Sequence, residues 1–162
     1  MKYRTTQKSI IVLIIFLTSY SFANAQIDIK SRVDEDTYSN FSIIINLFEK
    51  NIKPNDVVTL FIPINSNSIT SYLSSNNIEI TKSFLSKHTI KGVHTLQDFN
   101  NSLSISSEFE LTDINNDKYY VQKNLSSFLI SDKITTESNV VKELQLDNKH
   151  HIIFIMGALI NL

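Results

Sequence analysis

The sequence predicts a single domain with an α+β fold, and three observations support this prediction. The chain has 162 residues, a length typical of one domain with its own hydrophobic core. Apolar residues in the first half recur mostly at the three- and four-residue spacing of helices, which enclose one early strand. In the second half they alternate with polar residues or form short runs, as in strands. Helices followed by a strand-rich half are typical of α+β proteins.

Composition and charge exclude several classes of protein. Apolar residues make up 42% of the chain and charged residues 19%, which is too apolar for a disordered protein. The 15 Lys and Arg nearly balance the 16 Asp and Glu, so we expect no nucleic-acid partner. The chain has no Cys and only two Gly, so it has no thiol nucleophile and cannot form a Gly-rich cofactor loop. We therefore expect no cofactor and no enzymatic activity.

Residues 1–25 have the layout of a secretory signal peptide. Basic residues precede the apolar stretch 10–17, and Ala23-Asn24-Ala25 matches a cleavage site. A membrane-spanning helix needs about 20 apolar residues, which neither this stretch nor any later one supplies. We expect cleavage near Ala25 and a secreted or periplasmic mature chain with a net charge of −4 and no membrane span. Position 26 is Gln rather than the Cys of a lipoprotein, so we also expect no lipid anchor.

The mature chain is predicted to begin with a polar, acidic leader over residues 26–36, followed by a single domain over residues 37–162. Apolar residues from Tyr38 to Ile52 are spaced by three and four residues, which predicts an amphipathic helix. The Pro-Asn-Asp sequence at 54–56 ends this helix with a turn.

A buried strand and two shorter helices are expected next. The β-branched run 57–62, closed by Pro63, predicts a strand that is buried on both faces. Asn65 or Ser66 is suited to cap the first helix, and Asn77 the second, which ends near His88.

The rest of the chain predicts strands. Phe109 and Leu111 alternate with polar residues, and the polar turn 115–117 joins them to residues 118–123 as a hairpin. Residues 128–130 and 152–156 are further predicted strands. Residues 135–146 fit either a strand or a short helix.

Two motifs and the distance between them resemble the fasciclin domain family. Thr-Leu-Phe-Ile-Pro-Ile-Asn at 59–65 is similar to the family's first box, T-V-F-A-P-T-N. Residues 84–92 are similar to the family's leucine-rich helix, which ends in Tyr-His and is followed by β-type residues and Gly. The positions that keep the two patterns are Thr59, Phe61, Pro63, Asn65, Leu85, His88 and Gly92. The resemblance implies a β-wedge of mostly antiparallel strands with several short helices packed against it.

The resemblance also implies a function. It is that of a secreted, non-catalytic adhesion or binding module, which presents a surface to an extracellular protein or polysaccharide. The turn that contains Lys87, His88 and Gly92 matches the family's adhesive segment, with Lys87 in place of the Tyr, so we expect binding there first. Two alternatives are a small periplasmic hydrolase that uses His88 with Ser86 or Asp98, and a structural subunit of a surface assembly.

The same motif residues also have a structural interpretation. His88 can bury one ring face while a ring nitrogen reaches a backbone carbonyl. Gly92 suits a turn that requires a positive φ, and Asn65 a helix cap. Pro63 stops a strand where no further ladder N–H is needed.

Other ionisable residues predict no metal site and no catalytic pair. His150 and His151 are adjacent in a predicted strand, so they should point to opposite faces as solvated or half-buried side chains. His88 and His94 lack enough further ligands for zinc. Glu108 and Glu110 share a strand face that we expect to be at the surface.

Overall fold

The computed structural model describes residues 27–64, 67–74, 78–134 and 136–159. The predicted signal peptide and the predicted caps Asn65, Ser66 and Asn77 lie outside the described residues. No helix in the described ranges is long and apolar enough to cross a membrane.

Helices and strands both contribute to the fold, in agreement with an α+β class. The helical elements are η1 (Lys30–Arg32), α2 (Glu35–Asn51), α3 (Asn67–Leu73), α4 (Ile78–His88) and α5 (Leu96–Leu103). The strands are β1 (Val58–Pro63), β2 (Thr89–Lys91), β3 (Phe109–Thr112), β4 (Lys118–Asn124), β5 (Ser127–Ser131), β6 (Glu137–Gln145) and β7 (His150–Ile155). The predicted first helix, buried strand and hairpin are present. The strands predicted at 128–130 and 152–156 correspond to β5 and β7.

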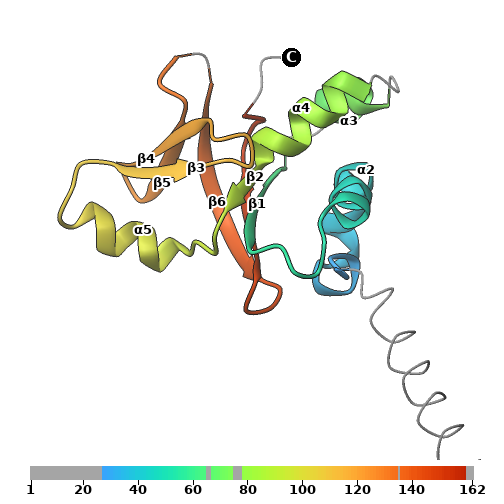
Figure 1. The fold of residues 1–162 in the computed structure, drawn as a ribbon, viewed down its shortest axis with the longest axis horizontal. Coiled ribbons are helices and arrows are strands. Elements are labelled where there is room, and N and C mark those ends of the chain that lie inside the picture. The colour runs from blue at the N-terminus through green and yellow to red at the C-terminus, as the bar shows by residue number, and fades with distance from the viewer. Residues whose placement is uncertain (1–26, 65–66, 75–77, 135, 160–162) are drawn as a thin grey trace, which may run out of the picture.

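The seven strands form one sheet in the order β2-β1-β7-β6-β5-β4-β3 (Figure 1). β1 and β7 pair in parallel, and the other neighbouring strands are antiparallel. The two end strands also meet, because Ile90 of β2 forms a bridge with Asp113 just after β3. The backbone N–H of Ile114 donates to the carbonyl of Thr89 at 3.0 Å. The sheet therefore curls until its ends touch, which leaves fewer unpaired backbone groups at its edges.

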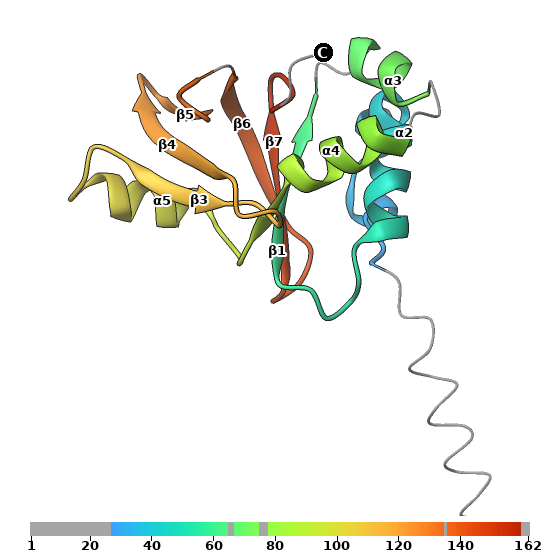
Figure 2. The same ribbon diagram turned by 45° about the horizontal axis from the view of Figure 1, so that its top comes forward.

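The helices lie on two sides of this curled sheet. α2, α3 and α4 gather beside β1, whereas α5 lies at the far side beside β3 and β4 (Figures 1 and 2). Two hydrophobic clusters result, and β1 contributes to both of them. Leu60 and Ile62 pack into the cluster under α2, α3 and α4, and Phe61 packs into the cluster that contains Phe99 of α5. All six residues of β1 are buried, which confirms the prediction of a strand covered on both faces.

Residues 27–33, which were predicted to belong to a polar leader, pack against the helical layer instead. Ile27, Ile29 and Val33 are buried. The buried carboxylate of Glu49 in α2 accepts hydrogen bonds from the backbone N–H groups of Ile29 at 2.9 Å and Lys30 at 3.0 Å. The leader prediction is wrong because alternate apolar residues in this segment enter the core, so the domain begins before residue 37.

Two elements of the second half depend on local signals. Helix α5, which the sequence analysis did not predict, begins with a capping box. The Thr95 hydroxyl accepts from the backbone N–H of Asp98 at 3.1 Å, and the Asp98 carboxylate accepts from that of Thr95 at 2.8 Å. The Thr-x-x-Asp pattern at 95–98 is the signal that could have predicted it. Within the ambiguous segment 135–146, Glu137–Gln145 form strand β6, in which buried Ser138 and Val140 alternate with exposed neighbours.

The β4–β5 turn holds Leu125 in a strained backbone conformation. Its φ is +51°, and its side chain is 94% exposed. A left-handed conformation costs an L-residue about 1–2 kcal/mol, whereas Gly adopts it freely. We expect Leu125→Gly to raise the free energy of unfolding by about 0.5–1 kcal/mol in urea denaturation, because the relief of strain exceeds the added entropy of the unfolded chain. Ser126→Gly in the same turn is the control, since Ser126 is not in the left-handed region and should gain no stability from Gly. If Leu125→Gly lowers the free energy of unfolding as much as Ser126→Gly does, the backbone at Leu125 is not strained.

Candidate functional site

The turn after β2, the short strand that follows α4, is held against β1 by hydrogen bonds. Gly92 has a φ of +86°, and its N–H donates to the carbonyl of Val57 at 2.8 Å. The Thr59 hydroxyl donates to the carbonyl of Gly92 at 2.9 Å and accepts from the N–H of His94 at 2.8 Å. A Cβ atom at position 92 would lie 3.3 Å from Nε2 of His94. The predicted need for Gly at position 92 is therefore confirmed, and Thr59 has a structural role in holding the turn.

His88 connects α4 to the C-terminal segment from inside the protein. Its side chain is fully buried and stacks on Phe84 with ring centroids 4.2 Å apart. Nδ1 donates to the carbonyl of Phe84 at 2.9 Å, and Nε2 accepts from the backbone N–H of Leu159 at 2.9 Å. These two bonds require the neutral imidazole with its proton on Nδ1. Burial lowers the pKa of His88 to about 3, with a smaller contribution from the nearby charge of Lys87.

The burial of His88 contradicts the expectation that its side chain binds a partner. Its ring cannot contact a partner at the surface, because no ring atom is exposed and both nitrogens are occupied. The side chains proposed as its hydrolytic partners bond elsewhere. Ser86 donates to the carbonyl of Ser83 at 3.0 Å, and Asp98 bonds to Thr95. The geometry therefore supports the structural interpretation of His88.

The remaining motif residues lie in the interior or outside the described residues. Phe61 is fully buried in the second hydrophobic cluster, and Leu85 packs against the first. Pro63 is the last residue of β1 and is opposite Ile155 in β7. Asn65, the predicted cap, lies outside the described residues. Of the predicted binding residues, Lys87 is the one whose charged side chain can reach a partner.

Lys87 borders an open groove of about 570 Å³ between the end of α2, the C-terminal half of α4 and the β3–β4 turn. Lys82, Leu85 and Ile114 also line this groove. Ile114 is 43% exposed, so its side chain is accessible from the groove. The sequence could not show that this turn and Lys87 line one groove, because their proximity depends on the closure of the sheet between β2 and β3.

Asp113 anchors the β3–β4 turn from a buried position. Its Oδ1 accepts from the backbone N–H groups of Asn115 at 2.8 Å and Asp117 at 2.9 Å. Its Oδ2 is buried and has no hydrogen-bond partner among the described residues. Burial raises the pKa of this carboxyl, because the charged form loses its hydration. Asn116 adopts a φ of +72°, in the left-handed region that Asn tolerates better than most residues.

We expect Asp113→Asn to raise the free energy of unfolding by about 1 kcal/mol at neutral pH. The amide oxygen retains the two backbone hydrogen bonds, and the buried charge is removed. Because the folded-state pKa is raised, the wild type regains this stability as it takes up a proton in acid. The advantage of the variant should therefore shrink as the pH falls toward 3.8, the usual pKa of Asp. Urea denaturation at several pH values measures this difference in the free energy of unfolding between the variant and the wild type. Asp113→Ala, which loses both bonds, should be about 1–2 kcal/mol less stable, and an equal effect of the two variants would contradict this role.

The four histidines do not form a metal site. His150 Nδ1 donates to Asp147 at 2.8 Å, and His151 Nε2 donates to Glu143 at 3.1 Å. Both rings are buried, so the expectation of solvated or half-buried histidines is wrong, although they do reach different partners. His94 Nε2 lies 2.9 Å from the carbonyl of Lys91, away from His88. Within the described ranges, no three His, Cys, Asp or Glu side chains are placed to hold a metal ion.

The carboxylates of β3 and its preceding residue form surface ion pairs. Glu110 pairs with Lys118 at 3.0 Å, and Glu108 pairs with Lys133 at 2.5 Å. The predicted surface position of these two glutamates is confirmed.

In comparisons with known proteins, no protein-family model matches this chain and no curated protein matches it. Membership of the fasciclin family therefore stays a prediction that rests on the positions of the motif residues.

Proposed function

We propose that this protein is a secreted or periplasmic, non-catalytic binding module of the fasciclin type. Its partner is an extracellular protein or polysaccharide, and its curled sheet with flanking helices is a fasciclin-like β-wedge. The observation that carries this proposal is the open groove beside Lys87, at the turn that resembles the family's adhesive segment.

The groove has the chemistry of a recognition surface. Lys82 and Lys87 supply ammonium donors, and Asn51 and Asn115 supply amide groups at its border. Apolar side chains that include Ile114 provide contact area between these polar groups. Such a combination suits a partner that carries carboxylate or hydroxyl groups.

The hydrolase alternative receives less support from the geometry. A general base needs a ring nitrogen within reach of the proton that it removes. Both nitrogens of His88 are occupied in the interior, so His88 has no lone pair to offer a substrate.

Binding of the purified protein to a glycan array and to immobilised extracellular proteins tests the proposal. Lys87→Glu should reduce binding at least tenfold, whereas Lys123→Glu, at an exposed position of β4 outside the groove lining, should leave it unchanged. The proposal fails if the wild type binds neither class of partner, or if both variants lose binding equally. Mass spectrometry of the exported protein tests cleavage near Ala25.

A further inference from the structure

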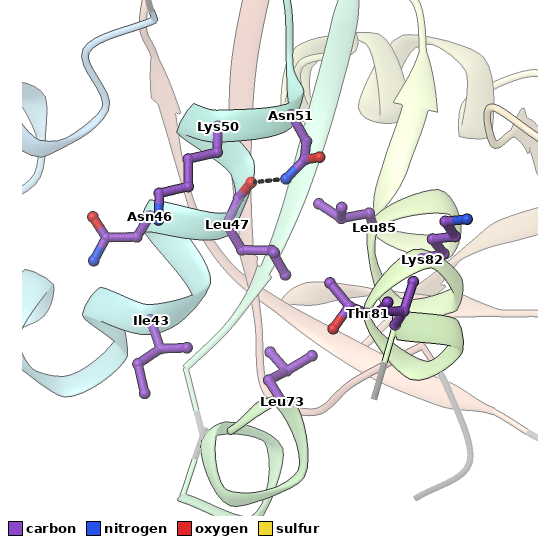
Figure 3. A pocket seen from close by; sticks show the side chains of 10 residues that line it. Ile43, Asn46, Leu47, Lys50, Asn51, Leu73, Thr81, Lys82 and Leu85 are labelled. Atoms are coloured by element: carbon purple, nitrogen blue, oxygen red, sulfur yellow. Dashed lines mark hydrogen bonds between the residues drawn. The ribbon is translucent and has the colours of Figure 1, made fainter. Parts of the chain in front are cut away.

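A second groove continues the groove beside Lys87 along α4. It lies between α2, α3 and the N-terminal half of α4 and has a volume of about 570 Å³ (Figure 3). The two grooves share Asn51, Lys82 and Leu85 in their linings, so they adjoin along α4, and together they are called the trough. α4 has 11 residues, which at 1.5 Å per residue corresponds to about 16 Å. This length matches roughly three turns of a helical peptide.

The floor of the second groove is apolar. Leu47, Leu73 and Leu85 point toward one another from three different helices (Figure 3). All three belong to, or pack against, the hydrophobic cluster under the helices. Two more apolar residues extend this surface into solvent, since Ile43 is 42% exposed and Ile78 is 69% exposed. The trough therefore offers apolar area that no other element in the described part of the chain covers.

The charged side chains that line the trough are all basic. Lys50, Lys82 and Lys87 line it, and none of its described lining residues is Asp or Glu. Acidic residues outnumber basic ones in the whole chain, so composition does not explain this asymmetry. Neither Lys50 nor Lys82 forms an ion pair with any described residue. In Figure 3 these two side chains stand on opposite rims and extend away from the gap.

We propose that the trough binds an acidic, amphipathic peptide segment of a partner protein. The apolar face of the segment would lie on the leucine floor, and its carboxylates would pair with the lysines on both rims. A long-chain fatty acid fits this charge pattern less well, because it has one carboxylate and the lysines are distributed along both rims. This inference rests on the proposed binding function and specifies the chemistry of the partner.

A designed helical peptide serves as the probe. It carries leucines at positions i, i+3, i+4 and i+7, flanked by glutamates, and a fluorescent label for anisotropy measurements. One control peptide has lysines in place of the glutamates, and a second has serines in place of the leucines. We expect the first peptide to bind at least tenfold more tightly than either control and to shift the methyl NMR signals of Ile43, Leu47 and Leu85. Added salt should weaken its binding.

Variants of the protein locate the interaction. Lys50→Glu and Lys82→Glu should each weaken binding of the acidic peptide at least fivefold. Lys123→Glu, which changes an exposed lysine of β4 outside the trough, is the matched control and should bind as the wild type does.

Several results would overturn the proposal. Equal binding of the acidic and basic peptides would be one such result, and methyl shifts outside the trough would be another. Tighter binding of laurate than of the peptide, or self-association of the protein through this face, would show that the trough has a different occupant. If Lys87→Glu abolishes binding to a natural partner while Lys50→Glu has no effect and the peptide does not bind, the binding function stands and this inference falls. If the wild type binds no natural partner at all, the proposed function itself fails.

Discussion

Replacing His88 with alanine is expected to lower the free energy of unfolding by about 3 kcal/mol. The backbone N–H of Leu159 loses its acceptor in a fully buried position, and an unsatisfied buried donor costs about 1–3 kcal/mol. Loss of the ring that stacks on Phe84 adds a cavity penalty. Urea denaturation followed by tyrosine fluorescence measures the change.

The neighbouring Lys87→Ala variant is the control for this prediction. The side chain of Lys87 is partly exposed and forms no hydrogen bond or ion pair with the described residues, so its removal should change stability by less than about 0.5 kcal/mol. A His88→Ala protein as stable as Lys87→Ala would show that His88 does not hold α4 to the C-terminal segment.

The stability of the wild type is expected to fall as the pH drops below about 6.5. His88 has a pKa of about 3 in the folded protein and 6.5 in the unfolded chain. Between these values the unfolded chain binds a proton that the folded protein excludes, so acid favours unfolding by up to about 1.4 kcal/mol per pH unit. At pH 7 both states are neutral at this position and the effect is absent.

Asp98 acts at lower pH than His88, and the raised pKa of Asp113, whose effect has the opposite sign, contributes equally to the wild type and to a variant at position 88. Hydrogen bonds from Thr95 lower the pKa of Asp98, whose stabilisation is lost only as the pH falls below its usual value of 3.8. A denaturation series between pH 7 and pH 5 on the wild type and on His88→Gln isolates the histidine. Identical slopes for the two proteins would contradict its burial as a neutral ring.

Phe99→Ala is the substitution with the other large expected effect, a loss of about 3–5 kcal/mol. Phe99 is the buried residue of α5, and its ring lies 5.6 Å from the rings of Phe109 and Phe128. Its removal leaves a cavity between helix and sheet and detaches the helix from the second hydrophobic cluster. Hydrogen exchange should accelerate throughout α5 and to a lesser degree in β3, while urea denaturation measures the overall loss.

Gln97 provides the matched control on the same helix. Its side chain bonds to Asn101 at an exposed position, so Gln97→Ala should change stability by less than about 0.5 kcal/mol. If Phe99→Ala leaves the exchange of α5 unchanged, another contact must hold this helix.

Local patterns predicted most helices and strands. The apolar spacing between Tyr38 and Ile52 predicted α2 to within a few residues, and the run 57–62 with its terminal Pro predicted β1. The hairpin of β3 and β4 followed from alternation and a polar turn. In each case the signal lies within one segment, where side-chain periodicity decides which face is buried.

Features that depend on distant segments were not predictable in the same way. His150 reaches the carbonyl of Lys53, which is 97 residues away in the sequence, and His151 reaches Glu143 only after β6 and β7 pair. The parallel pairing of β1 with β7 joins two segments about 90 residues apart. The trough along α4 likewise requires α2, α3 and the β3–β4 turn to assemble around one helix.

The central claim is that position 88 stabilises the fold while position 87 faces the partner. Unfolding free energy and partner binding, measured side by side on His88→Gln and Lys87→Glu, test it most directly. We expect His88→Gln to lose about 1–3 kcal/mol of stability yet bind normally at a temperature where it is folded. Lys87→Glu should lose binding with a stability change below about 1 kcal/mol. The opposite pattern, in which His88→Gln is stable and inactive while Lys87→Glu binds normally, would contradict the account.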